Sequence, residues 1–184
     1  MTDPLAGQKI AFLVANEGIE QVELTEPWKA VKDAGGTPVL IAPEEGEAQA
    51  FNHLDKADAF PVDLTVAAAD VADYAGLVLP GGVANPDDLR THPEAVRLVH
   101  QFSEAGKPIA SICHAAWTLI DAGVADGRRL TSWPSLTTDL TNAGAEWVDE
   151  EVVIDEEGPG VLISSRNPDD LPAFCKAIVD RFGS

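Results

Sequence analysis

The stretch Pro108-Ile-Ala-Ser-Ile-Cys113-His114-Ala-Ala-Trp-Thr-Leu-Ile-Asp-Ala122 changes its pattern within a few residues. The apolar run that ends at Cys113 is typical of a strand covered on both faces. From His114 onward the composition is that of a helix, and Gly123 closes it. The sequence therefore predicts a buried strand that runs directly into a helix, with a cysteine and a histidine at the junction.

Similar alternation extends along the rest of the chain, which predicts a mostly parallel sheet with helices on both faces. Further buried strands are predicted at 9–15, 37–42 and 74–80, and short β segments at 151–155 and 161–164. Helices are predicted at 22–34, 92–105 and 168–182. We interpret residues 43–59 as a loop or small hairpin, and expect residues 1–184 to form one α/β domain.

The charge balance excludes several classes of partner. Thirty-one acidic residues face twelve Lys and Arg, which leaves a formal net charge of −19. A phosphate backbone or an anionic membrane would repel such a chain, so we expect neither nucleic acid nor membrane as a partner. No segment is long and apolar enough to span a bilayer, and no secretory signal is recognisable. With only Cys113 and Cys175 present, we expect free thiols and a reducing cytoplasm.

Function in open parallel sheets gathers beyond the carboxyl ends of the strands. Residues 17–23, 81–88 and 113–114 follow three of the predicted strands. Cys113 is the sharpest signal among them, because a helix dipole and free backbone N–H groups at a strand-to-helix turn favour a thiolate. The alternative is that Cys113 is a small apolar residue at the end of a core strand.

The neighbouring segments supply groups that suit a reactive thiol. Gly81-Gly82 permits close backbone approach, so its N–H groups and that of His114 are candidates for an oxyanion hole; alternatively, the pair only ends a strand. Glu17, Glu20 and Glu23 are candidates for acid–base work, or are ordinary acids at a helix N-terminus. Whether His114 pairs directly with Cys113 stays open, because neighbouring side chains leave the backbone at different angles.

The remaining histidines and glycines do not add a second type of site. No histidine follows His114, so this chain alone cannot assemble a downstream Cys/His/Glu triad. We interpret His53, His92 and His100 as surface residues without metal-ligand spacing. The Gly-Gly pairs lack the spacing of a dinucleotide or phosphate loop, so we expect no cofactor and no metal. Cys175 is interpreted as a packing residue, whereas Trp133 is a candidate site residue.

Several motifs together resemble the PfpI family, within the superfamily that holds class I glutamine amidotransferases, the Parkinson's-associated protein deglycase and bacterial general stress proteins. They occur in family order over nearly the whole chain. The matching segments are Ala15-Asn-Glu-Gly-Ile-Glu-Gln-Val-Glu-Leu24 with Pro27, Leu79-Pro-Gly-Gly82, Pro86-Asp-Asp-Leu-Arg90, Gly106-Lys-Pro-Ile-Ala110, Ile112-Cys-His114, Leu130-Thr-Ser-Trp133, Asn142-Ala-Gly-Ala-Glu-Trp147 and Ser164-Ser-Arg-Asn-Pro168.

The resemblance implies a three-layer, flavodoxin-like sandwich and a homo-oligomer with the active site near a subunit interface. It implies a nucleophile at Cys113, with the Glu23 carboxyl hydrogen-bonded to the thiol and Glu20 close by. It further implies that His114 is the catalytic histidine, and that the N–H groups of Gly82 and His114 form the oxyanion hole.

The rest of the implied site depends on less direct matches. The acidic triad member of PfpI-type peptidases comes from a neighbouring subunit, and Asp87 falls nearest that position. Trp133 matches the family's tyrosine beside the site, and we expect it to line the pocket together with Gly81. Two departures put peptidase activity in doubt: His114-Ala-Ala replaces the common His-Gly-Pro, and Asp87 is shorter than the glutamate found in relatives.

Three functions follow from this reading. The first is a cysteine-dependent hydrolase of the PfpI type, either an intracellular peptidase or a deglycase acting on glyoxal or methylglyoxal adducts, in a general stress response. The alternative is a redox-sensing stress protein or chaperone whose Cys113 is oxidised reversibly. A purely structural protein is the third possibility.

Overall fold

A seven-stranded sheet runs through the centre of the protein, in the computed structural model that describes residues 3–184. Its strand order is β11-β12-β8-β7-β1-β3-β6. All neighbours are parallel except β11 and β12. The strands are β1 (Lys9–Leu13), β3 (Thr37–Ala42), β6 (Leu64–Thr65), β7 (Gly76–Leu79), β8 (Ile109–Ile112), β11 (Val152–Asp155) and β12 (Leu162–Ser165).

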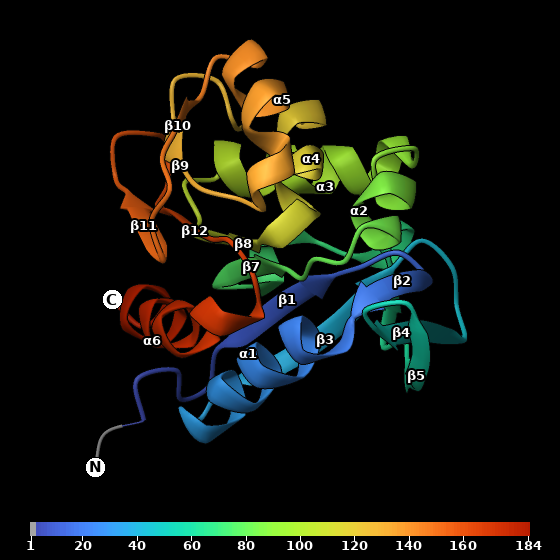
Figure 1. Cartoon of the computed structure of the whole chain (residues 1–184). Helices are drawn as coiled ribbons and strands as arrows, with labels where there is room; N and C mark the ends of the chain where they lie inside the picture. Colours follow the sequence, from blue (N-terminus) through green and yellow to red (C-terminus); the bar gives the residue numbers. More distant parts are fainter. Residues whose placement is uncertain (1–2) are drawn as a thin grey trace.

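Helices cover both faces of this sheet (Figure 1). Helices α1 (Gln21–Asp33) and α6 (Leu171–Phe182) contact each other on one face. The other face carries α2 (Ala84–Leu89), α3 (Pro93–Glu104), α4 (Ala116–Asp121) and α5 (Thr137–Asn142). Alternate residues of β1 enter two separate apolar clusters, Ile10 and Phe12 on the α1 side and Ala11 and Leu13 on the other. The predicted three-layer α/β sandwich is thereby confirmed.

A second, three-stranded sheet lies at one end of the molecule. It consists of β2 (Glu17–Glu20) and the hairpin of β4 (Glu47–Asn52) and β5 (Asp55–Pro61), with β2 parallel to β4. The sequence allowed a small hairpin at residues 43–59, and the helix predicted from residue 22 begins at Gln21. Residues 17–20, for which no strand was predicted, are extended by pairing with β4. Glu17 therefore lies in a strand, whereas Glu20 directly precedes the helix and Glu23 lies in its first turn.

Two local differences from the predicted elements affect the site. Residues 84–89, for which no helix was predicted, form α2. The helix predicted from His114 begins as a 3-10 turn at Cys113–Ala115 and becomes α-helical at Ala116. A small sheet of β9 (Arg129–Leu130) and β10 (Glu146–Trp147) and the helix α5 were not predicted. Within residues 3–184, the helices are too short or too polar to cross a membrane.

Candidate active site

Cys113 stands directly after β8 with its backbone in the left-handed region, at φ 63°. A residue with a Cβ atom rarely adopts this conformation, and such strain collects at functional sites. The sharp turn between strand and helix turns the side chain out of the sheet, as in a nucleophile elbow. The predicted strand-to-helix junction is therefore present, and the thiol opens into a cleft between the sheet edge and the hairpin.

The thiol of Cys113 contacts the imidazole of the next residue. The Sγ atom lies 3.1 Å from Nδ1 of His114. That ring is stacked on Trp133, with centroids 5.5 Å apart and planes inclined by 25°. It also makes a T-shaped contact with Trp117, with ring centroids 5.2 Å apart. Its Nε2 atom lies 3.5 Å from Oγ of Ser135. The direct Cys–His contact that the sequence left open is present, and two aromatic rings fix its orientation.

Glu23 brings a fully buried carboxyl group to the same place. Its side chain is 0% exposed on the first turn of α1, and neither carboxyl oxygen accepts a hydrogen bond of normal geometry within residues 3–184. Burial, and next the negative charge of Glu20, raises the pKa of Glu23 to about 8, against smaller opposing effects of the Cys113 thiol and the N–H groups of Gly81 and Gly82. The carboxyl is therefore mostly protonated at neutral pH.

The expectation that the helix end lowers the pKa of Cys113 was wrong. Burial raises the pKa of this thiol, and the nearby Glu23 carboxylate raises it further, while the N–H groups of Gly82 and His114 lower it in part. The side chain is only 6% exposed, and the helix that follows starts with a 3-10 turn, so desolvation exceeds the effect of the dipole. Because each acid resists ionising beside the other, Glu23 and Cys113 hold at most one negative charge at neutral pH.

Only the backbone of Gly81 lies between the Glu23 carboxyl group and Cys113. A Cβ atom at this position would overlap Oε2 of Glu23 and lie 2.6 Å from Cβ of Cys113. The next residue, Gly82, has φ 90° and lies against the carbonyl oxygen of Gly18, which leaves no space for a side chain. The Gly-Gly pair therefore does more than end a strand: it brings backbone N–H groups to the sulfur and to the buried carboxyl.

Asn85 holds this loop in place and was missed in the sequence. Its Oδ1 accepts from the N–H of Ala15 at 2.7 Å, and its Nδ2 donates to the carbonyl groups of Pro80 and Gly81 at 2.9 and 3.0 Å. Side-chain amides commonly bond to the backbone near turns, and that preference was the only available signal. The long-range bond to Ala15 ties the Gly-Gly loop to the end of β1.

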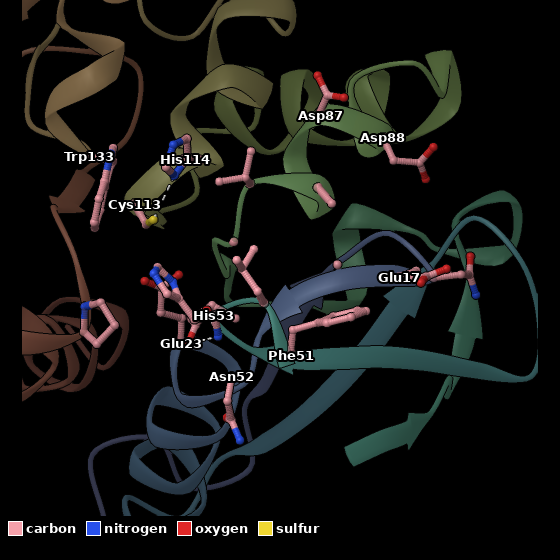
Figure 2. A pocket seen from close by; sticks show the side chains of 18 of the residues that line it. Glu17, Glu23, Phe51, Asn52, His53, Asp87, Asp88, Cys113, His114 and Trp133 are labelled. Atoms are coloured by element: carbon pink, nitrogen blue, oxygen red, sulfur yellow. Dashed lines mark hydrogen bonds between the residues drawn. The ribbon is translucent and has the colours of Figure 1, made fainter. Parts of the chain in front are cut away.

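Two other predicted site residues lie farther from the sulfur. Glu20 lines the cleft, and its carboxylate accepts from the N–H of His53 at 3.1 Å. Asp87 is exposed on α2, apart from His114 (Figure 2). The structure thus brings together Cys113, His114 and Glu23 within one chain, and leaves Asp87 on the rim.

The cleft has a volume of about 1350 Å³. Figure 2 shows Cys113, His114 and Trp133 on one side, with Glu23 and His53 facing them. Its lining residues come mainly from β2, the hairpin tip, α2 and the Cys113 turn. They are Asn16, Glu17, Gly18, Glu20, Glu23, Glu44, Phe51, Asn52, His53, Leu54, Gly82, Val83, Ala84, Asp87, Asp88, His92, Cys113, His114, Trp133 and Pro168. His53 is exposed and His92 is half-buried, and both of these surface residues line the cleft.

A flavodoxin-like sandwich with a strained cysteine at a strand-to-helix turn, beside a buried glutamate, defines a recognisable class of protein. The chain belongs to the DJ-1/PfpI family, whose sequence profile matches residues 8–181. A deglycase of Pyrococcus horikoshii is 40% identical over 171 residues, which are 93% of this chain and 97% of that protein. General stress protein 18 of Bacillus subtilis is 38% identical over 168 residues, 91% of this chain and 94% of its own length.

Solved structures agree with this assignment. A two-domain protein of Anabaena variabilis with DJ-1/ThiJ/PfpI-like and ferritin-like domains aligns with a TM-score of 0.87 and 32% identity. The alignment covers 96% of this chain and 48% of that chain. The family thus includes proteins named as deglycases and as a general stress protein.

Proposed function

We propose that the protein is a cysteine-dependent deglycase that hydrolyses glyoxal and methylglyoxal adducts on amines. The observation that carries this proposal is the position of the Cys113 Sγ, which opens into the cleft 3.1 Å from Nδ1 of His114 and beside the buried carboxyl of Glu23. The deglycase of Pyrococcus horikoshii, at 40% identity over 93% of this chain, supports the reaction class.

Glu23, His114 and Cys113 have different roles in proton transfer. Burial raises the pKa of Glu23 to about 8, so at neutral pH its carboxyl keeps a proton that it can donate to a thiolate as a hydrogen bond. Burial also lowers the pKa of His114, whose neutral ring can accept the thiol proton through Nδ1. The sulfur then attacks the substrate carbonyl as an anion, although its pKa is raised in the resting site.

The charge that develops on the substrate oxygen needs donors already in place. The backbone N–H groups of Gly82 and His114 lie close enough to the sulfur to affect its pKa, which suits an oxyanion hole around the attacked carbonyl. In the overall reaction, an aminocarbinol adduct of methylglyoxal and one water give a free amine and lactate. The aldehyde carbon is oxidised while the ketone carbon is reduced, so no external oxidant is needed.

The test is turnover of a methylglyoxal-treated amino acid, with the released amine and lactate quantified by chromatography. Cys113→Ser should abolish release, whereas Cys175→Ser, which alters a half-buried thiol on α6, should retain it. A peptide substrate run in parallel distinguishes a peptidase. Equal turnover by Cys113→Ser and the unmodified protein would refute a cysteine-dependent mechanism.

A second candidate is a redox-sensing stress protein, which the relation to general stress protein 18 favours. Oxidation would place oxygens on Cys113 next to the protonated carboxyl of Glu23, which could donate to them. Mass spectrometry after mild peroxide treatment separates the two candidates. Oxidation confined to Cys113 without turnover supports sensing.

The proposal extends to the domain organisation, the oligomeric state and the cellular compartment of the enzyme. We propose that residues 1–184 act as one domain, in a homo-oligomer whose interface lies near the site and lets Asp87 of one subunit approach His114 of another. The exposed position of Asp87 on α2 supports that arrangement. Two free thiols fit the reducing cytoplasm, where we place the protein.

A further inference from the structure

His53 shares an unusual backbone property with Cys113. Within residues 3–184, these two are the non-glycine residues with positive φ, at 64° and 63°. Both line the same cleft, from opposite walls (Figure 2). His53 is the first of two residues that join β4 to β5, and a two-residue hairpin turn commonly takes a left-handed residue at this position. The turn places His53 on the cleft wall opposite Cys113, which makes the hairpin tip part of the site.

The surroundings that hold His53 come from the site itself. Its backbone N–H donates to the Glu20 carboxylate at 3.1 Å. Glu20 ends β2, which pairs with β4 and leads directly into the helix that carries Glu23. The negative charge of Glu20 also raises the pKa of Glu23. One carboxylate thus connects the hairpin tip to the buried acid beside the nucleophile.

The imidazole of His53 differs from the other imidazoles in having no bonded protein group. In the described part of the chain, His114 contacts Cys113, His92 lies 3.4 Å from Asp88, and His100 bonds to the Ala122 carbonyl group. His53 is bonded there through its backbone N–H alone. A ring that is fixed at its backbone and free at both nitrogens is available to a ligand in the cleft.

We infer that His53 contacts the substrate and donates the proton to the nitrogen that leaves it. This inference rests on the proposed function. When the carbon–nitrogen bond of the aminocarbinol breaks, its electron pair stays on nitrogen, and the hydroxyl oxygen on the same carbon forms a C=O bond and releases its proton to solvent. A protonated His53 ring supplies the proton that makes a neutral amine. The ring, now neutral, takes a new proton from solvent.

His114 is less suited to this step. Its Nδ1 faces Cys113 and its Nε2 faces Ser135, so neither nitrogen points to the far side of a substrate bound to sulfur. Burial lowers the pKa of His114, so its ring is mostly neutral at neutral pH. The neutral ring can accept a proton but has none to donate as an imidazolium. A donor on the opposite wall completes the acid–base pair across the cleft.

The experiment compares two adducts whose leaving groups differ in their need for a proton. Methylglyoxal adducts of an amine and of a thiol are offered to the wild-type protein, His53→Asn and His53→Gly. Asn and Gly both tolerate a left-handed backbone, so they remove the imidazole ring without adding strain. His100→Asn, at an exposed histidine of α3 that does not line the cleft, is the control.

We expect kcat for the amine adduct to fall roughly 100-fold or more in both His53 variants. The thiol adduct should keep its rate within about threefold, because a thiolate has a pKa near 8.5 and leaves without a proton donor. Added imidazole should restore part of the amine rate to His53→Gly. The rate of Cys113 alkylation should not change, which separates proton donation from a disturbed nucleophile.

Two results overturn the inference while leaving the deglycase function intact. The first is an equal loss on both adducts, which indicates a structural role for His53. The second is an unchanged amine rate in His53→Asn and His53→Gly. Failure of the wild-type protein to turn over either adduct is a different result: it overturns the proposed function, and the inference with it.

Discussion

The Nδ1 atom of His114 lies 3.1 Å from the Sγ atom of Cys113, although the two residues are neighbours in the chain. The left-handed backbone at Cys113 makes this contact possible, because it turns the thiol toward the following residue. His114→Phe should keep the stacking on Trp133 and remove both ring nitrogens. We expect turnover to fall by roughly 10²- to 10⁴-fold, measured as release of amine from a glycated amino acid. A loss below about threefold would show that His114 does not take part in proton transfer.

Glu23 makes the stability of the protein depend on pH. Its folded-state pKa is raised from 4.5 to about 8, so between these values the folded protein binds more protons than the unfolded chain. The free energy of unfolding therefore falls as pH rises from 4.5 to 8, by an amount on the order of a few kcal/mol.

Glu23→Gln should remove this dependence. The free energy of unfolding of both proteins can be measured with urea between about pH 5 and pH 8. The value for the variant minus that for the wild-type protein should increase as pH rises. The titration of His114 affects both proteins alike and cancels in the difference. Parallel pH profiles would contradict the buried, protonated carboxyl.

Gly82 offers a test of the loop that carries the N–H groups. Gly82→Ala would place a methyl group against the carbonyl oxygen of Gly18, with φ at 90°. Gly46→Ala is a matched control, since its φ is 102° and no atom of the described residues lies within 4 Å of the added Cβ. We expect about 1–2 kcal/mol of destabilisation in the control from left-handed strain. Gly82→Ala should lose more stability than that, together with activity. Equal losses would show that the Gly18 contact is unimportant.

Asp87 is expected to act across an interface, because it lies exposed on α2 and apart from His114 within its own chain. Asp87→Asn and Cys113→Ser should each lower activity when prepared alone. A mixed oligomer contains a site with Cys113 from one subunit and Asp87 from the other. Co-refolding the two variants should therefore restore activity, with size-exclusion chromatography confirming the oligomer. No recovery in a mixed oligomer would remove Asp87 from the site.

The cleft should prefer substrates without negative charge. Among residues 3–184, the lining includes no Lys or Arg and six carboxyl groups, which are Glu17, Glu20, Glu23, Glu44, Asp87 and Asp88. A phosphate-bearing adduct is repelled by such a lining, more so in a protein with a net charge of −19. We expect kcat/KM to be higher for a glycated arginine than for a glycated nucleotide, and the ratio to shrink as salt is added. A ratio independent of salt would exclude electrostatic selection.

The central sheet was predictable because buried strands and capped helices leave strong local patterns. The run up to Cys113 and the helix after it occur as expected, and so does the run at 9–15 that contains β1. The three segments expected at the carboxyl ends of the strands do meet at one cleft. Those features depend on periodicity and on a general rule of parallel sheets, which one sequence is enough to reveal.

The features that were missed depend on long-range contacts. Residues 17–20 form a strand because β4 pairs with them, and His53 reaches the cleft because that hairpin folds back on β2. The Asn85 bond to Ala15 joins residues 70 positions apart. The raised pKa of Cys113 follows from how completely neighbours exclude water, which the local helix dipole does not reveal.

The absence of a side chain at Gly81 has a consequence for how this cleft can change. The Glu23 carboxyl group and the Cys113 side chain both lie against the backbone of Gly81, so this wall tolerates almost no substitution. The opposite wall is a hairpin tip whose residues, from His53 to Lys56, are exposed. New substrate ranges should therefore be obtained by changing the turn residues after His53, while His53 and the reactive wall are kept as a constant scaffold.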